Sequence, residues 1–247
     1  MRYQLLATDY DGTIATHGVV DAATIDALHR ARAHGLRLVL VSGRELESLQ
    51  ATFNEFDLFE RMVLENGGIV YEPATGRVRS LCEPPTAEFV AALLARGVHP
   101  LSVGRVIVAT FEPHETTVLE VIRELGLERQ VIFNKGAVMV LPSGVNKATG
   151  LHEALAELGI DPLATVGVGD AENDHALLEL CGIGAAVANA LPSLQARADY
   201  VASKDHGAGV AEVIDLLLAD QLYRKERVVD GSAVRALGDV VDVHPDA

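Results

Sequence analysis

The sequence predicts an α/β protein in which a doubly wound parallel sheet is interrupted by an inserted α+β segment. Short apolar runs alternate with helical patterns in the first and the last parts of the chain. The middle instead holds Pro84-Pro85 and two β-rich runs that are split by Asn134-Lys135-Gly136, a pattern typical of a hairpin. The 247 residues suffice for one large or two modest domains with a proper hydrophobic core.

The first part of the predicted core alternates strands with helices. The opening apolar run ends in acidic residues and Gly12, as a buried parallel strand ends in a loop. Strands that alternate with helices form right-handed βαβ units, so we expect a parallel sheet that is covered on both faces. After the opening strand, the predicted elements are a helix over 22–34, a strand over 36–41, a helix over 45–53 and a strand over 62–64.

From about Arg77 the pattern changes, and it changes back at Pro142-Ser143-Gly144. Between these points we expect a helix over 87–95, a strand over 105–111, a helix over 116–125 and a β pair over 130–133 and 137–141. The returning βα pattern predicts helices over 148–158, 174–180, 192–198 and 209–219 and strands over 164–169, 183–187 and 200–201. We therefore expect a core of residues 1–80 and 143–220, an inserted domain over 81–142, and a C-terminal extension over 221–247 without an assigned role.

Composition restricts the possible partners. The 35 acidic and 20 basic residues give a net charge of −15, which opposes non-specific binding to nucleic acid or to an anionic membrane. Cys82 and Cys181 lie too far apart in the sequence to form a CxxC motif, so no disulfide framework is implied. No apolar run reaches the length of a signal peptide or a membrane span. We expect a cytoplasmic protein with small-molecule partners, as a monomer or a small homo-oligomer.

Four polar clusters each follow a predicted strand directly: residues 9–13, 42–44, 66–68 and 169–174. The carboxyl ends of parallel strands share one sheet edge, where ligands bind. Each cluster taken alone is also explained by turn chemistry and helix caps. Together, however, their four aspartates would repel one another without a hard cation, and this density of oxygen ligands suits Mg²⁺. The four are Asp9, Asp11, Asp170 and Asp174.

A calcium loop that starts at Asp170 is excluded by its spacing. Such a loop needs Gly at its sixth position and Glu at its twelfth, where this chain has His175 and Cys181.

A divalent cation, a hydroxyl group at Ser42 and a nearby lysine are what phosphoryl transfer requires. One carboxylate could act as the nucleophile and form an aspartyl phosphate. A second carboxylate two residues further on could protonate the leaving oxygen and then activate water. Asp9 and Asp11 have this spacing, and Gly12 permits the tight turn.

The order of these motifs resembles that of the haloacid dehalogenase-like (HAD) superfamily of aspartate-nucleophile phosphatases. The motifs are DYDGT (9–13), SGR (42–44), GVNK (144–147) and GDAEND (169–174). Residues 66–68 and 185–214 resemble the Cof-type branch, in which a type II cap is inserted between the second and third motifs. The resemblance covers about residues 3–218. It implies a Rossmannoid core and a Mg²⁺-dependent phosphatase for a small phosphorylated metabolite, such as a sugar phosphate or phosphoglycolate.

The resemblance assigns a role to each matching residue. Asp9 is the nucleophile, and Asp11 is the general acid and base. Ser42 binds a phosphoryl oxygen beside Gly43, and Lys147 offsets the negative charge of Asp9 and the phosphate. Asn173 is a polar site residue. Mg²⁺ is held by the Asp9 carboxylate, the Asp11 backbone carbonyl and Asp170, with Asp174 either a further ligand or a residue that contacts the ligands. Asn189 matches a further polar site residue, but Val187-Ala188 precede it where the branch has Met-Gly.

Some alternatives stay open at this point. Arg44 either binds an anionic substrate group or forms an ordinary surface ion pair. Of the two lysines near the motifs, Lys147 is favoured for the phosphate; Lys135 is either a solvated turn residue or a contact to the non-reacting part of the substrate. A phosphomutase on the same scaffold, similar to phosphomannomutase, is the nearest rival function. A phosphorylation-controlled signalling domain is shorter and has no cap, and the intact motifs oppose a non-catalytic binding protein.

Overall fold

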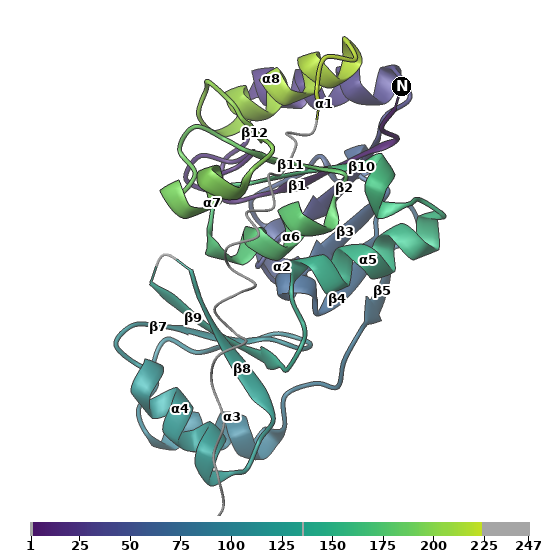
Figure 1. Ribbon diagram of the computed structural model, residues 1–247. Coiled ribbons are helices and arrows are strands. Elements are labelled where there is room, and N and C mark those ends of the chain that lie inside the picture. Colours follow the sequence, from purple (N-terminus) through teal and green to yellow (C-terminus); the bar gives the residue numbers. More distant parts are fainter. Residues whose placement is uncertain (1, 135, 224–247) are drawn as a thin grey trace, which may run out of the picture.

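The computed structural model describes residues 2–134 and 136–223. Its larger part is built on an eight-stranded sheet with the order β12-β11-β10-β1-β2-β3-β4-β5 (Figure 1). Neighbouring strands from β12 to β3 run parallel, as the sequence predicts for a doubly wound sheet. The strands are β1 (Leu5–Asp9), β2 (Arg37–Val41), β3 (Arg61–Leu64), β4 (Ile69–Glu72), β5 (Arg77–Ser80), β10 (Thr165–Gly169), β11 (Ile183–Ala186) and β12 (Tyr200–Val201).

Helices cover both faces of this sheet (Figure 1). The helices α1 and α8 pack together on one face, and α5 and α6 pack together on the other, so the central strands are buried. The predicted α/β class is therefore confirmed. The helices of this part are α1 (Ala22–Ala33), α2 (Leu46–Gln50), α5 (Lys147–Leu158), α6 (His175–Leu180), α7 (Pro192–Arg197) and α8 (His206–Leu218).

Two antiparallel strands at one edge, β4 and β5, were not predicted. β4 pairs with β3 and β5 pairs with β4, both in antiparallel register. Their sequences, IVYE and RVRS, are short and carry charges, which weakens the apolar signal of a strand. Two of these charges pair with α5, where the Glu157 carboxylate accepts hydrogen bonds from Arg77 at 3.3 Å and from Arg79 at 2.8 Å.

The second part of the molecule is an antiparallel sheet, with the order β6-β7-β9-β8, that carries helices on its outer face (Figure 1). Val108, Val138 and Val140 pack against these helices in a small core of their own. Because side chains alternate along a strand, Ala109 and Met139 face the larger sheet instead. The elements are α3 (Ala87–Ala95), β6 (Ser102–Val103), β7 (Val108–Phe111), α4 (Glu115–Glu124), β8 (Arg129–Asn134) and β9 (Ala137–Pro142).

Several predicted boundaries shift. The hairpin of β8 and β9 forms as expected, with Asn134 opposite Ala137, whereas Lys135 lies outside the described residues. The strand predicted over 105–111 begins only at Val108, because the N–H groups of residues 105–107 donate to a glutamate of the larger part. α8 begins at His206 rather than at 209, and α2 ends at Gln50 rather than at 53.

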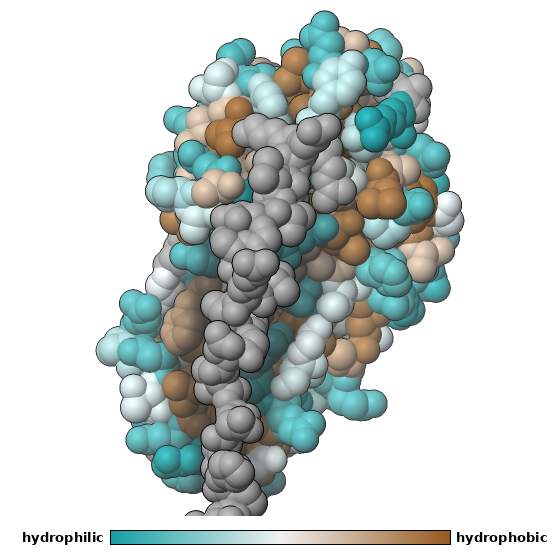
Figure 2. All heavy atoms as spheres, viewed as in Figure 1, coloured by the Kyte–Doolittle hydropathy of each residue, from teal (hydrophilic) through white to brown (hydrophobic). Residues whose placement is uncertain are grey.

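Hydrophilic and apolar residues are mixed on the part of the visible face that is coloured (Figure 2). Among the described residues, none of the helices combines the length and the apolarity that crossing a membrane requires. Of the predicted C-terminal extension, residues 224–247 lie outside the described residues.

Candidate active site

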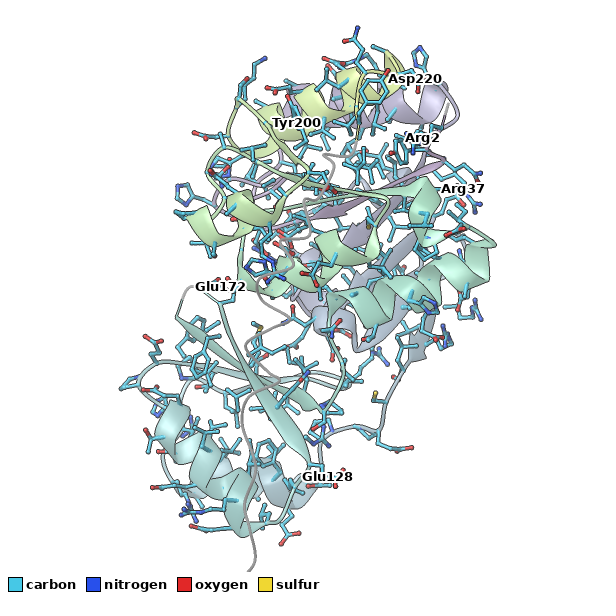
Figure 3. All side chains as sticks on the ribbon, viewed as in Figure 1. Arg2, Arg37, Glu128, Glu172, Tyr200 and Asp220 are labelled. Atoms are coloured by element: carbon cyan, nitrogen blue, oxygen red, sulfur yellow. The ribbon has the colours of Figure 1, made fainter. Side chains whose placement is uncertain are left out.

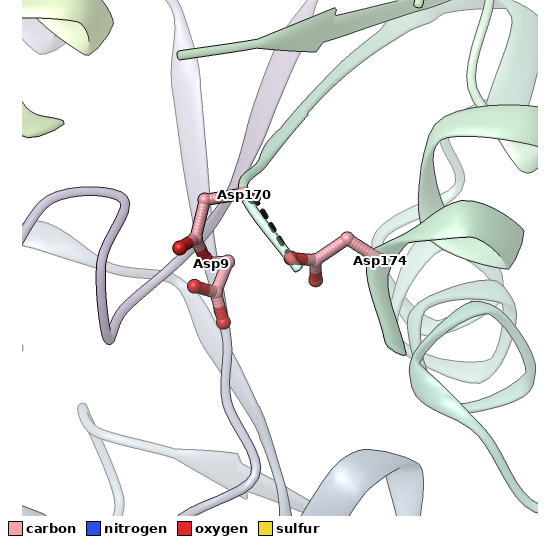
Figure 4. Close-up of side chains that lie close together, drawn as sticks. All are labelled: Asp9, Asp170 and Asp174. Carbon is pink, nitrogen blue, oxygen red and sulfur yellow. Dashed lines mark hydrogen bonds between the residues drawn. The ribbon is translucent and has the colours of Figure 1, made fainter. Parts of the chain in front are cut away.

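Three buried aspartates meet at the carboxyl edge of the central strands (Figure 4). Asp9 is the last residue of β1, and Asp170 follows β10, the parallel neighbour of β1. Asp174 comes from the 3₁₀ turn η4 (Glu172–Asp174), and its Oδ2 accepts hydrogen bonds from the N–H groups of Asp170 and Ala171, each at 3.0 Å. One oxygen of each aspartate lies within 4.8 Å of those of the others. The parallel pairing thus brings together residues that lie far apart in the sequence.

Lys147 provides the positive charge of this cluster. Its Nζ donates to Asp9 Oδ1 and to Asp174 Oδ1, both at 2.6 Å. The side chain of Asn146 caps α5 by accepting from the N–H of Thr149 at 3.0 Å, so the helix begins at Lys147 and aims this side chain at the aspartates. Burial alone would lower the pKa of the Lys147 amine, but Asp174 and Asp9 outweigh it and raise that pKa.

Asp9 has an unusual proton affinity. Burial raises the pKa of its carboxyl group from 3.8 to about 7; Lys147 opposes this rise, and the charges of Asp174 and Asp170 add to it. One lysine does not balance three buried carboxylates. The donor set is all oxygen, buried and negatively charged, and therefore fits a hard divalent cation such as Mg²⁺.

This electrostatic arrangement predicts how Mg²⁺ affects stability. Because the folded pKa of Asp9 lies above its unfolded value, the folded protein binds the extra proton between about pH 4 and about pH 7, and the metal-free protein loses stability as pH rises through that window. Mg²⁺ competes with that proton. We therefore expect Mg²⁺ to raise the melting temperature more at about pH 8 than at about pH 5, as measured by differential scanning fluorimetry. Equal shifts at both pH values would contradict the raised pKa of Asp9.

Asp11 lies at the rim of the site in a two-point ion pair with Arg44. Arg44 Nε donates to Asp11 Oδ2 and Arg44 Nη2 donates to Asp11 Oδ1, both at 2.7 Å. The guanidinium carbon also lies 5.1 Å from the centre of the Tyr10 ring. Arg44 was expected either to bind an anionic substrate group or to form a surface ion pair, and the structure contains an ion pair. The partner of Arg44 is Asp11, the expected general acid and base, rather than an ordinary surface carboxylate.

The loop after β2 supplies Ser42 and Gly43. Ser42 is fully buried, and its Oγ accepts from the backbone N–H of Arg44 at 3.1 Å, whereas Gly43 lines the cavity beside Asp9. Of the predicted asparagines, Asn173 also lines the cavity and donates from Nδ2 to Asn66 Oδ1 at 2.8 Å.

Asn189 lies behind the loop that follows β1. Its Nδ2 donates to the Gly12 carbonyl at 2.8 Å, and its Oδ1 accepts from the N–H of His206 at 2.7 Å. Asn189 does not line the cavity. Its contacts support the loop that carries Asp11.

The cavity over the aspartates has a volume of about 550 Å³ and lies between the two sheets. Asp9, Asp11 and Lys147 form its floor, and the smaller sheet provides a mainly apolar roof that includes Ala109, Phe111, Ala137 and Met139. The cavity therefore offers a charged reactive end and an apolar wall. A larger cavity of about 670 Å³ lies beside the two segments that join the parts, and none of the predicted site residues lines it.

Some residues of the site were not predicted in a role. Thr13 Oγ1 donates to Asp170 Oδ1 at 3.3 Å, and Thr13 already stands in the first motif. Asn66 belongs to a cluster that was singled out only for its place after a strand. Asn134 of the roof was singled out only as part of the predicted turn, and Met139 carries no sequence signal that separates it from ordinary strand residues.

The fold and the site define an α/β protein with a buried cluster of carboxylates and a lysine beneath a smaller antiparallel sheet. The family model described as haloacid dehalogenase-like hydrolase matches residues 6–94 and 104–214. The chain belongs to this haloacid dehalogenase-like hydrolase family, which confirms the resemblance seen in its motifs.

Relatives that are named as phosphatases agree with this assignment. The chain is 32% identical over 219 residues to a phosphoglycolate phosphatase from Methanothermobacter thermautotrophicus, covering 85% of this chain and 96% of that protein. It is 31% identical over 221 residues to another from Natronomonas pharaonis, with coverage of 85% and 96%. The expectation of a phosphatase-type hydrolase is confirmed at the level of the family.

Solved structures match the fold at lower identity. The HAD subclass IIB sugar phosphatase BT4131 superposes with a TM-score of 0.71 at 21% identity, covering 87% of this chain and 98% of that one. Thermoplasma acidophilum 0175 superposes with a TM-score of 0.73 at 18% identity, with coverage of 86% and 97%. These likenesses show the shared fold.

Proposed function

We propose that this protein is a Mg²⁺-dependent phosphatase that hydrolyses a small phosphate ester through an aspartyl phosphate on Asp9. The observation that carries the proposal is the buried cluster of Asp9, Asp170, Asp174 and Lys147, which opens onto a cavity lined by Asp9, Asp11 and Lys147. Such a cavity has room for a small ester with its phosphoryl group at the charged end. The names of the phosphoglycolate phosphatase relatives support the same chemistry.

In the first step, an Asp9 oxygen attacks phosphorus while the bond from phosphorus to the leaving oxygen breaks. Asp11 gives a proton to that leaving oxygen. In the second step, water loses a proton to Asp11 and attacks the same phosphorus, so that the bond to Asp9 breaks and inorganic phosphate is released. Lys147 favours the ionised form of Asp9 and balances charge on the phosphoryl oxygens.

Mg²⁺ would be held by Asp9, Asp170, Asp174 and the backbone carbonyl of Asp11, and its charge would stabilise the phosphoryl oxygens. Ser42 and Gly43 would orient the phosphoryl group from the loop after β2. The smaller domain over 81–142 would act as a cap that excludes water and selects the leaving group. The cavity volume of about 550 Å³ and the phosphoglycolate phosphatase relatives favour a small sugar phosphate or a phosphorylated acid.

Free phosphate measured across a panel of sugar phosphates and phosphorylated acids, with Mg²⁺ present, tests this proposal. We expect phosphate release from at least one ester and none after chelation of the metal. Turnover to an isomer without release of phosphate would support the phosphomutase instead. No turnover of any ester would contradict both functions.

Asp170→Asn tests the metal site. We expect this variant to need about 10- to 100-fold more Mg²⁺ for half-maximal activity, because it loses one anionic ligand from the cluster. A Mg²⁺ titration of the initial rate gives the value. Asp26→Asn, the same change at an exposed position of α1, is the matched control. An unchanged titration in Asp170→Asn would show that Asp170 is not a ligand.

A further inference from the structure

Another buried carboxylate, Glu65, lies where the two sheets meet, and the proposed mechanism does not use it. Glu65 follows β3 in the turn η2 (Glu65–Gly67) of the core and is only 1% exposed. Its carboxylate reaches into the cap, where it accepts hydrogen bonds from three consecutive backbone N–H groups. Oε1 accepts from Arg105 at 3.0 Å, and Oε2 accepts from Val106 at 2.7 Å and Ile107 at 2.9 Å.

The two hydrogen bonds from Val106 and Ile107 are buried and join the cap to the core. Two other contacts on the same side are exposed: the hydroxyl of Ser102 donates to Glu45, and Arg105 lies 3.5 Å from Glu47. Exposed pairs of this kind add little stability. A buried carboxylate is costly unless its lone pairs are satisfied, and among the described residues the three N–H groups of the cap satisfy them.

The backbone and the packing around Glu65 are adapted to this contact. Glu65 and Asn66 both have a positive φ, 52° and 53°, in the left-handed region that residues with a side chain rarely adopt. Such strain persists only where the surroundings enforce it. On the cap side, a Cβ atom on Gly104 would lie 2.8 Å from the Glu65 carboxylate carbon, so a larger residue there would displace the carboxylate from its place.

The same turn also contacts the catalytic residues. The N–H groups of Glu65 and Asn66 donate to the carbonyls of Arg44 and Ser42, each at 3.0 Å. Asn66 Nδ2 lies 2.9 Å from the sulfur of Met139 in the roof, while Asn66 Oδ1 accepts from Asn173. A Cβ atom on Gly67 would lie 2.0 Å from the carbonyl oxygen of Asn146, the residue before Lys147. The turn therefore joins the roof of the cavity to its floor.

We propose that Glu65 is a positioning residue that fixes the cap on the core and thereby sets which phosphate esters fit the cavity. This inference rests on the proposed phosphatase function, but it concerns the roof rather than the reaction. An ester whose leaving group contacts the roof depends on Glu65. A very small substrate such as acetyl phosphate, an acyl phosphate whose leaving group does not fill the cavity, is independent of it.

The variant Glu65→Gln tests this role, because it keeps the size of the side chain and loses the charge and one acceptor oxygen. We expect KM to rise at least about tenfold for the best ester of the panel, while kcat/KM for acetyl phosphate stays within about twofold of the wild type. The matched control is Glu128→Gln, the same change on the exposed end of the cap (Figure 3). This control variant should leave the kinetic constants for both substrates unchanged.

The variant Gly104→Ala approaches the same contact from the cap, and we expect the same selective rise of KM. It also serves if Glu65→Gln fails to fold. The role of Glu65 would be overturned if the folded variants had an unchanged KM for the best ester of the panel. An equal change of the kinetic constants for that ester and for acetyl phosphate would overturn it as well.

Small-angle X-ray scattering gives a readout that does not depend on activity. We expect a larger radius of gyration for Glu65→Gln than for the wild type and Glu128→Gln, because the cap is released. Superimposable scattering curves would overturn the proposal. If the wild-type protein hydrolyses neither the panel nor acetyl phosphate, the proposed function fails, and the scattering comparison alone decides on Glu65.

Discussion

Asp9→Asn is expected to lower phosphate release by about 10⁴-fold or more, while the protein stays folded. The amide keeps the shape of the side chain but is no nucleophile, and Lys147 retains Asp174 as a partner at 2.6 Å. The substitution also removes one of three buried carboxylates that repel one another, so we expect no loss in melting temperature. Release of phosphate from the best ester of the panel, at saturating Mg²⁺, is the measurement.

The matched control is Asp26→Asn, which removes a carboxylate from the exposed face of α1 and should retain wild-type rates. Near-native turnover by Asp9→Asn would remove Asp9 from the nucleophile role. A loss of activity together with a large drop in melting temperature would point to a structural role instead.

Lys147→Met is expected to destabilise the metal-free protein by about 3–5 kcal/mol at about pH 8, because it leaves buried carboxylates without their cation. Activity should fall by about 10²- to 10³-fold, since the charge that balances the phosphoryl oxygens is lost. Urea unfolding with and without Mg²⁺ measures the first effect. We expect Mg²⁺ to restore part of the lost stability, since it supplies positive charge to the same carboxylates.

Lys204→Met is the matched control, because Lys204 is exposed. It should change the free energy of unfolding by less than about 0.5 kcal/mol. A metal-free Lys147→Met protein as stable as the wild type would contradict the electrostatic account of the cluster.

The central part of the fold was predictable because its strands are continuous apolar runs that end in polar clusters. That pattern places Asp9 and Asp170 at one sheet edge before any coordinates are considered. β4 and β5 were not predicted because their charged residues interrupt the apolar run. One of these charges, on Arg79, pairs with Glu157 of α5. The strand predicted over 105–111 is longer than the observed one because its first N–H groups donate hydrogen bonds to Glu65. This contact between cap and core has no counterpart in the local sequence pattern.

The candidate site, too, was predictable only in part. Residues in motifs, such as Asp11 and Lys147, were predicted from the order of those motifs. The two-point pairing of Asp11 with Arg44 depends on side-chain directions that no spacing encodes. Glu65 was missed because it precedes the cluster that was singled out, and its partners are backbone N–H groups, which carry no sequence signal.

The central claim is that Asp9 forms a covalent bond to phosphorus, and the variant Asp11→Asn with p-nitrophenyl phosphate tests it most directly. The nitrophenolate group leaves without protonation, whereas water attack still needs the Asp11 base, so the phosphorylated enzyme should accumulate. We predict a burst of about one equivalent of nitrophenolate per active site, and phosphate on the Asp9 peptide after acid quench and mass spectrometry. No burst and no phosphorylated Asp9, while the ester is turned over, would contradict the account.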